Sequence, residues 1–183
     1  MGSEMCIRDR VEVENYFPEL RQNLEHLYLA LYFCEVADYF TREGMTAKHE
    51  LNLLYLSLRA LSVPSLPEEL VRYIYEFRML AIAGEAPRIF ECIRCGKTEN
   101  LHHFYVGDAG IVCDDCHDGK TGILLSETAI YTLQRILSSP LQKLYTFSVS
   151  EAVLAQLKEV VSRYFKAHTD RTFHSLDMLD IGF

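Results

Sequence analysis

The sequence predicts a mainly α-helical protein, a helical bundle with a small metal-binding β-hairpin inserted near its middle. Apolar residues recur every three or four positions on both sides of the insert, which is the period of amphipathic helices. Between them stand two Cys-x-x-Cys motifs, separated by short apolar runs and turn residues. Because the helices before and after the insert are both amphipathic, we expect them to share one core.

Three helices are predicted before the insert. The first begins at Phe17 and ends at Gly44, because glycine is favoured just after a helix. The second stops before Pro64. The third begins at Pro67-Glu68-Glu69, where proline and acidic side chains suit a first turn, and ends at Gly84. The residues expected to be buried are, in helix order, Leu20, Leu24, Leu27, Leu31 and Cys34; Leu51, Leu54, Leu58 and Leu61; and Leu70, Ile74, Phe77 and Ala81.

Two helices are predicted after the insert. One begins at Ser126-Glu127-Thr128 and stops at Ser138-Ser139-Pro140. The other opens on Ser148-Val149-Ser150-Glu151, whose Ser-x-x-Glu spacing is that of a capping box. The segment from Phe173 to Phe183 has apolar residues but no clean period, so no element is predicted there. The expected buried residues are Ile130, Leu133 and Leu137, then Leu154, Leu157, Val161 and Phe165.

The two cysteine pairs predict a metal site. A tetrahedral Zn²⁺ takes four thiolates at about 2.3 Å, and each Cys-x-x-Cys turn supplies two of them. The 17 residues between the pairs are enough to fold back as a hairpin, with a turn at 107–110 between apolar runs. Gly96 suits the left-handed backbone position that follows such a turn. We therefore expect a zinc hairpin over residues 90–118, with Zn²⁺ held by Cys92, Cys95, Cys113 and Cys116.

The same four cysteines suit other chemistry than zinc binding. Disulfides within the pairs would indicate a redox protein, but no βαβ pattern surrounds either pair. A mononuclear iron site uses the same four thiolates, and the sequence leaves both metals open. Four thiolates close the coordination sphere, so the metal is expected to be structural, with no catalytic residue and no enzyme activity. Nearby side chains are expected to be surface or outer groups (His102, His103 and His117) or a solvated acidic face (Asp114, Asp115 and Asp118).

Length and composition limit the class of protein to which the chain can belong. The chain has 183 residues, of which 49% are hydrophobic, enough for one substantial core. It has no apolar run of about 18 residues and no signal peptide, so no membrane association is expected. Cysteines in metal-type pairs favour a reducing, cytoplasmic location. Cys34 is expected in the core, and Cys6 has no evident role. Residues 1–13 are predicted to be an unstructured leader, and residues 14–183 the folded domain.

The charge balance bears on nucleic-acid binding. The net charge is −8, from 18 basic and 26 acidic residues. Phosphate binding depends on clustered Lys and Arg, so we expect at most weak, salt-sensitive binding to single-stranded DNA. One C-terminal stretch has a more even balance of basic and acidic residues and is a candidate for binding an anionic partner. Its basic residues are Lys158, Arg163, Lys166 and Arg171. The alternative is a solvated helix face of mixed charge.

The segment Leu70–Gly96 resembles the C-terminal region of the bacterial recombination mediator RecO. In that family a helix with an F-E-x-x-L-L type core leads through G-x-x-P to the first C-x-x-C-G. The matching positions here are Tyr75-Glu76-Phe77-Arg78-Met79-Leu80, Gly84, Pro87 and Cys92–Gly96. Gly110–Cys116 is similar to the family's second knuckle, and 20–40 and 173–179 also fit, except that His174 stands where the family usually has Lys. The resemblance runs from Glu14 to Leu179.

This resemblance implies a role in DNA repair and homologous recombination. The family anneals complementary strands and, with RecR, loads RecA onto strands coated by the single-stranded-DNA-binding protein. Its members begin with an OB-fold domain, which carries the main DNA contact. No alternating strands precede Phe17, so that domain is expected to be missing. The expected partners are RecR and the acidic, apolar tail of the single-stranded-DNA-binding protein, with Arg72, Arg78 and Arg88 as candidate groove residues.

A second family has a similar cysteine spacing. Arf GTPase-activating proteins combine a zinc module with helices and place an arginine finger just after the last knuckle. Here residues 117–122 follow Cys116 without an arginine, and the chain has no Trp. The alternative to a RecO-like role is therefore an Arf-GAP-like zinc module without catalysis, or a generic structural or interaction domain.

Overall fold

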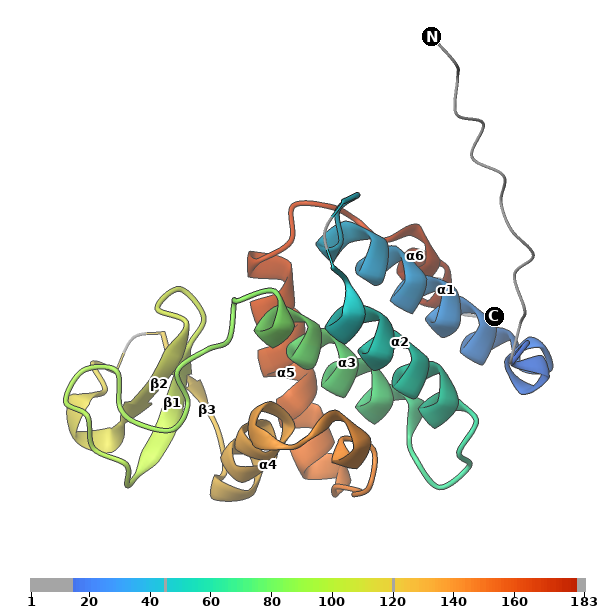
Figure 1. The fold of residues 1–183 in the computed structure, drawn as a ribbon. Coiled ribbons are helices and arrows are strands. Elements are labelled where there is room, and N and C mark those ends of the chain that lie inside the picture. Colours follow the sequence, from blue (N-terminus) through green and yellow to red (C-terminus); the bar gives the residue numbers. More distant parts are fainter. Residues whose placement is uncertain (1–14, 45, 120, 181–183) are drawn as a thin grey trace, which may run out of the picture.

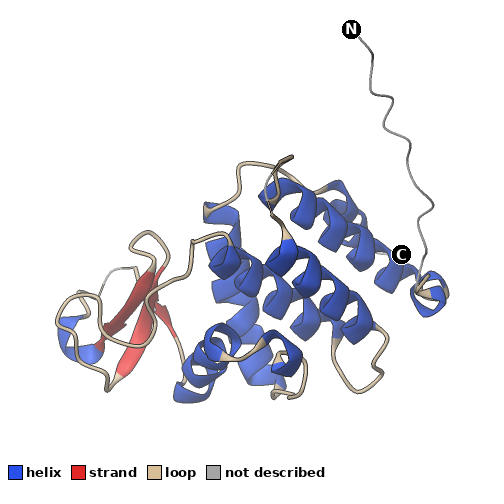
Figure 2. Cartoon of the chain, in the orientation of Figure 1, coloured by secondary structure: helices blue, strands red, loops and turns tan. Residues whose placement is uncertain are grey.

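The computed structural model describes residues 15–44, 46–119 and 121–180. Helices make up most of it, and the strands are confined to one end, beside α4 and α5 (Figures 1 and 2). The predicted fold class is thus confirmed, while the predicted leader and Cys6 lie outside the described residues. The helices are α1 (Leu24–Phe40), α2 (Lys48–Leu61), α3 (Glu68–Ile82), α4 (Glu127–Ser138), α5 (Glu151–Ala167) and α6 (His174–Asp180). The strands are β1 (Leu101–Tyr105), β2 (Gly110–Cys113) and β3 (Ile123–Leu124), and short 3₁₀ turns are η1 (Pro18–Arg21), η2 (Asp114–Cys116) and η3 (Leu141–Lys143).

Helix α3 forms the centre of the bundle and packs against α1, α2, α4 and α5. Three of its four predicted inward residues, Leu70, Ile74 and Phe77, are fully buried, and Ala81 is half-buried. The helix ends at Gly84 as predicted, with a φ of +92° that favours glycine. The Glu85 N–H then donates to the Leu80 carbonyl at 2.8 Å, which closes the helix end. Because α3 contacts helices on both sides of the insert, the predicted shared core is confirmed.

The buried faces of α1 and α2 differ from the prediction. Leu24 and Leu31 are 46% and 47% exposed, and Cys34 is exposed rather than in the core. The physical reason is that leucines occur on several faces of both helices, so spacing alone does not select the inner one. Larger aromatic side chains occupy the inner face of α1, and small residues let α2 approach its neighbours. The buried residues are Leu29, Tyr32, Phe33, Val36 and Ala37 in α1, and Leu53, Ser57, Ala60 and Leu61 in α2.

The helices after the insert begin close to their predicted starts. The Ser126 side chain accepts from the Ala129 N–H at 3.2 Å and caps α4. Helix α5 is capped by Ser150, which accepts from the Val153 N–H at 3.4 Å. The capping box that began at Ser148 was therefore wrong by two residues, because the chain turns into the helix only after Ser150.

Helix α6 forms where no element was predicted, and contacts with α1 account for it. The Glu35 carboxylate accepts hydrogen bonds from the Ser175 N–H and hydroxyl, at 3.4 and 3.0 Å. The Phe173 ring lies 5.5 Å from the Tyr32 ring and 5.8 Å from the Phe165 ring. A helix this short is unstable by itself, so tertiary packing decides its formation.

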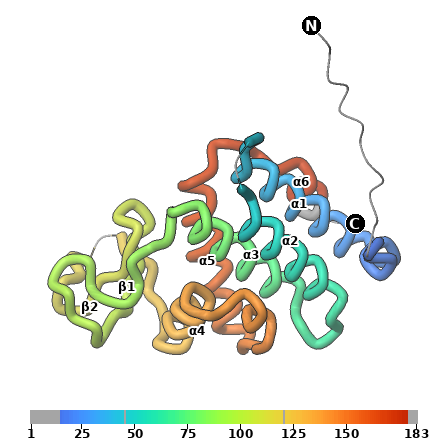
Figure 3. The backbone as a smooth tube through the Cα atoms, in the orientation of Figure 1, coloured from blue at the N-terminus to red at the C-terminus, as the bar shows by residue number. Residues whose placement is uncertain are grey.

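The insert is a three-stranded antiparallel sheet with the order β2-β1-β3. Phe104 of β1 pairs with Ile111 on one side and Ile123 on the other, so the predicted hairpin is confirmed and a third strand is added. The chain leaves α3, runs through the sheet and returns directly into α4 (Figure 3). The Phe104 ring meets Tyr164 of α5 edge-on, with centroids 5.6 Å apart, and so joins the sheet to the helical core.

Candidate metal centre and adjoining cavity

The four predicted cysteines come together at one point of the insert. Their Sγ atoms all lie within 4.8 Å of one another, and those of Cys95 and Cys113 are 3.7 Å apart. A tetrahedral site with Zn–S bonds of about 2.3 Å has S···S edges of about 3.8 Å. A disulfide would need about 2.05 Å, and all four thiols are free. The cluster therefore has the dimensions of a four-thiolate metal site, of the kind that zinc or iron occupies.

The first knuckle is shaped by its backbone. The Gly96 N–H donates to the Cys92 carbonyl at 2.8 Å, and the Cys92 N–H donates to the Lys97 carbonyl at 2.7 Å. Gly96 has a φ of +76°, as predicted for the residue after this turn. Burial opposes ionisation of the Cys92 thiol, but hydrogen bonds from the backbone of nearby residues lower its pKa to about 6. This favours the thiolate form of Cys92, whereas the neighbouring thiols and burial raise the pKa of Cys116, and burial raises that of Cys113.

A glycine allows the second knuckle to approach the first. A Cβ at Gly110 would stand 2.3 Å from Ile93 Cγ2 and 3.1 Å from the Arg88 carbonyl oxygen. The Ile93 N–H donates to the Ile111 carbonyl at 3.0 Å, which ties the first knuckle to β2. Cys113 ends β2 and Cys116 ends η2, so strand pairing positions the first of these thiols and the short 3₁₀ turn that follows positions the second.

Ion pairs join the two knuckles around the thiols. Lys97 lies 2.7 Å from Asp115, and Arg94 lies 3.2 Å from Asp118. Arg94 also donates to the Cys116 carbonyl. The three acids predicted to be a solvated face are exposed, and two of them, Asp115 and Asp118, pair with basic residues of the other knuckle. They cross-link the metal unit rather than simply facing water.

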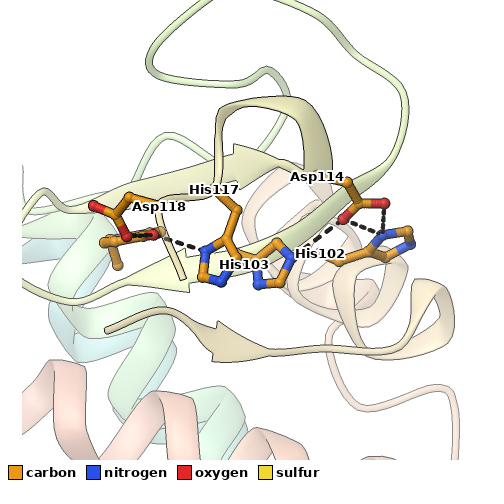
Figure 4. Close-up of polar contacts among 6 residues, drawn as sticks. His102, His103, Asp114, His117 and Asp118 are labelled. Atoms are coloured by element: carbon orange, nitrogen blue, oxygen red, sulfur yellow. Dashed lines mark hydrogen bonds and ion pairs between the residues drawn. The ribbon is translucent and has the colours of Figure 1, made fainter. Parts of the chain in front are cut away.

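The histidines of the insert form a connected polar group on one side of the sheet (Figure 4). Asp114 lies between His102, at 2.9 Å, and His103, at 3.2 Å. The His103 ring stacks on the His117 ring with centroids 3.6 Å apart. Asp114 thereby orients the two strand histidines, and the stack holds the segment that follows Cys116 against β1. The expectation that these histidines are outer groups fits their position.

A separate cavity of about 480 Å³ lies where α1, α3, α5 and α6 meet. Aromatic and aliphatic side chains line one part of it, including Phe165, Phe173 and Leu176. Basic side chains from α3, from α5 and from the loop that follows α5 line another part, namely Arg72, Lys166 and Arg171. Two acids, Asp170 and Asp177, also border it.

A buried carboxylate forms the floor of this cavity. Glu76 is only 1% exposed, and its Oε1 accepts from the Tyr32 hydroxyl and from Arg72 Nε, both at 2.7 Å. Its Oε2 has no hydrogen-bond partner among the described residues. Burial and the Glu76 charge raise the pKa of Tyr32. Burial would lower the pKa of Arg72, but the neighbouring Glu76 outweighs it and raises that pKa.

The three arginines proposed from the sequence do not meet on one surface. Arg72 borders the cavity just described. Arg78 donates to the carbonyls of Ile136, at 3.1 Å, and Leu137, so it caps the C-terminal end of α4. Arg88 is exposed near the metal unit and pairs with Glu91 at 2.6 Å.

Two basic residues of the cavity belong to the stretch that the sequence marked for an anionic partner. Lys166 and Arg171 line the cavity, whereas Lys158 and Arg163 do not. Spacing along the sequence could not separate the two pairs, because the cavity depends on how α6 packs on α1. Glu76 was visible only as part of a family-like motif.

These features define a class of protein: a helical scaffold that carries a hairpin closed by a cluster of four cysteines with the dimensions of a metal site. The chain belongs to the family described as Recombination protein O C terminal, whose model matches residues 21–177. The expected resemblance is confirmed. Within the described residues, no helix is long and apolar enough to span a bilayer.

Several curated relatives carry the name DNA repair protein RecO. The one from Acetivibrio thermocellus is 32% identical over 181 residues, which cover 97% of this chain and 72% of that protein. The relative from Symbiobacterium thermophilum is 28% identical, covering 98% of this chain and 73% of that protein. The relative from Alkaliphilus metalliredigens is 24% identical, covering 97% and 73%.

Proposed function

We propose that this chain is the helical, metal-containing part of a RecO-type mediator of DNA repair and homologous recombination, and that it acts by docking partners rather than by catalysis. Its family membership and the names of its relatives support the repair role. The observation that carries the docking role is the cavity between α1, α3, α5 and α6. The domain would span residues 14–183, and the partners would be RecR and the tail of the single-stranded-DNA-binding protein, in the bacterial cytoplasm.

The chemistry of the cavity suits an acidic peptide that ends in an apolar residue. Phe165, Phe173 and Leu176 offer contact to an aromatic or aliphatic end group. Lys166 and Arg171 lie at an accessible part of the lining, where they would meet carboxylates. Acids also border the cavity, but Lys166 forms no ion pair with any described residue, so it is available to a carboxylate of the peptide. Among the three arginines proposed from the sequence, only Arg72 borders this cavity, where it pairs with Glu76.

The metal would serve the fold rather than the docking chemistry. We propose one structural Zn²⁺ on Cys92, Cys95, Cys113 and Cys116, a set whose spacing fits four thiolates. When bound, it supplies a rigid cross-link between the two knuckles and no open coordination position. Arg94 and Lys97 reinforce the same link from outside.

Titration calorimetry with an acidic peptide ending in an aromatic residue tests the docking proposal. Lys166→Ala and Arg171→Ala should each weaken binding by about 2–10-fold, as expected for a partly exposed charge contact. Lys158→Ala, on the same helix but away from the cavity, is the matched control. Removing the terminal aromatic residue should weaken binding more than removing one acid.

Two outcomes would count against this function. If neither the peptide nor RecR binds the folded, metal-loaded protein, docking does not reside in this chain. If Lys158→Ala weakens binding as much as Lys166→Ala, the cavity is not the site. GTPase activation by an Arf-GAP-like mechanism is the remaining control and should be nil, since no arginine follows Cys116 within residues 117–122.

A further inference from the structure

The stretch from α6 onward has the chemistry of the ligand proposed for the docking cavity between α1, α3, α5 and α6. It reads Asp177-Met178-Leu179-Asp180-Ile181-Gly182-Phe183, with two acids, several apolar residues and then an aromatic ring. An acidic peptide with an aromatic end is also what the basic and apolar parts of the cavity lining suit. Neither the metal site nor the docking proposal uses residues 178–183.

The first part of this stretch already borders the cavity. Leu176 and Asp177 of α6 are among its lining residues, and Phe173, just before the helix, is another. Helix α6 packs alongside α1 (Figure 1) and is tied to it by hydrogen bonds to the Glu35 carboxylate, so α6 forms one wall of the cavity. Residues 181–183 lie outside the described residues, and they follow directly on this wall.

One cation of the cavity is available to an acid of this stretch. Arg72 lies 2.7 Å and Arg171 lies 3.7 Å from a carboxylate oxygen, whereas Lys166 forms no ion pair with any described residue. Asp177 is exposed and likewise has no ion pair among the described residues, and Asp180 adds a second acid at the last position of α6. A chain that turned back from α6 would therefore bring acids toward a free ammonium group and apolar residues toward the apolar part of the lining.

The segment 181–183 is long enough to reach the cavity. The backbone rises about 4.5 Å from Asp177 to the end of α6, and three extended residues span about 10 Å. Gly182 stands two residues after the end of α6, where glycine commonly takes the left-handed conformation that redirects the chain. Phe183 can therefore come back to the level of Asp177, which borders the cavity.

We propose that residues 181–183 fold back and place the Phe183 ring in the docking cavity of their own chain, where they compete with an acidic partner peptide. The proposal rests on the function proposed for the cavity and adds its regulation, because a partner must displace this segment. The short connection to α6 keeps the segment at an effective concentration in the millimolar range, which a second copy of the chain does not have. Occupancy by the segment lowers the apparent affinity for the peptide in proportion to the fraction of cavities left free.

Tryptophan fluorescence of Phe183→Trp tests the contact directly, because the chain has no other tryptophan. We expect emission at shorter wavelength and weaker quenching by acrylamide than in Tyr16→Trp, whose position is 66% exposed. Adding Lys166→Ala should move the emission of Phe183→Trp toward that of Tyr16→Trp. Lys158→Ala, on the same helix but away from the cavity, should leave it unchanged.

Titration calorimetry measures the competition. A chain stopped after Asp180 should bind an acidic peptide that ends in an aromatic residue about 2–10-fold more tightly than the full chain, because the cavity is then free. Phe183→Ala should give most of the same gain, since a buried aromatic ring provides most of such a contact. Met178→Ala is the matched control, because Met178 is 44% exposed on α6 and does not line the cavity.

Four results would overturn the inference. The first is equal emission and quenching for Phe183→Trp and Tyr16→Trp. The second is shielding of the indole that Met178→Ala removes and Lys166→Ala leaves, because the ring would then pack only on α6. The third is shielding that is lost on dilution, which would place the segment in the cavity of a second copy. The fourth is equal affinity of the full and the stopped chain for a peptide that both bind.

Failure of the proposed function would look different. Neither the full chain nor the chain stopped after Asp180 would then bind the peptide, while the indole of Phe183→Trp would stay shielded and would still respond to Lys166→Ala.

Discussion

Replacing Arg72 with alanine tests the buried ion pair at the floor of the docking cavity. Arg72 Nε lies 2.7 Å from Glu76 Oε1, and Glu76 is 1% exposed. Without Arg72, the carboxylate would retain one hydrogen bond, from the Tyr32 hydroxyl, and no countercharge at this distance. Removing one partner of a buried ion pair costs about 3–5 kcal/mol. We therefore expect Arg72→Ala to lower the free energy of unfolding by about that amount.

Urea denaturation followed by far-UV circular dichroism measures this change. Arg163→Ala is the matched control, because its pair with Glu159, at 3.2 Å, also spans one helical turn but lies in solvent. That variant should lose less than about 0.5 kcal/mol. Replacing both partners, as Arg72→Met with Glu76→Leu, should cost less than Arg72→Ala alone, since no buried charge is left.

A loss below about 1 kcal/mol for Arg72→Ala would refute this reasoning. It would mean that water enters the cavity and solvates Glu76, so that the carboxylate is not held in a low-dielectric site. An equal loss in the control variant would also refute it, because the effect would then come from helix propensity.

Three further predictions concern the metal unit and one half-buried acid, Glu68. Removing the metal with a chelator should disorder the hairpin but leave most of the helical dichroism, because the helices have their own core; complete loss of helix would contradict this. Gly110→Ala should destabilise the protein by about 1–3 kcal/mol and weaken metal binding in competition assays, since its Cβ would meet Ile93; wild-type stability would show that the knuckles can separate. Burial and the neighbouring Glu25 and Glu69 raise the pKa of Glu68 to about 7, so the folded state binds this proton more tightly than the unfolded chain. The stabilisation is complete below the unfolded pKa of about 4.3 and is lost as the pH rises through about 7, so thermal unfolding scans should show a midpoint that falls over this range and falls less in Glu68→Gln. If the midpoint of the wild type instead rose with pH relative to that of Glu68→Gln, the predicted direction of the pH dependence would be wrong.

Much of the fold follows from local signals in the sequence. The end of α3 at Gly84 and the cap of α4 at Ser126 follow from preferences of single residues. The meeting of the four thiols also follows from spacing, because a Cys-x-x-Cys turn fixes its own geometry and the hairpin between the pairs is short.

What escaped prediction depends on contacts between distant segments. Leu24 and Leu31 have the spacing of a buried stripe, yet α1 turns Tyr32 and Phe33 inward because these rings pack on α3 and Phe173. Helix α6 has no periodic pattern in its sequence. It forms because Glu35 of α1 accepts a hydrogen bond from Ser175 in its first turn. The docking cavity depends on that helix, so no pattern in the sequence indicates it.

The position of the metal hairpin between α3 and α4 has a consequence for folding kinetics. The connection from Ile82 to Glu127 is 44 residues long, and it must close before α4 can dock on α3. A metal that joins Cys92 to Cys116 bypasses the residues between them and shortens the effective loop to about half. Halving a loop lowers its closure entropy cost by about 0.6 kcal/mol. Loading the metal early should therefore speed assembly of the bundle by about 3-fold, although the ion contacts none of its helices.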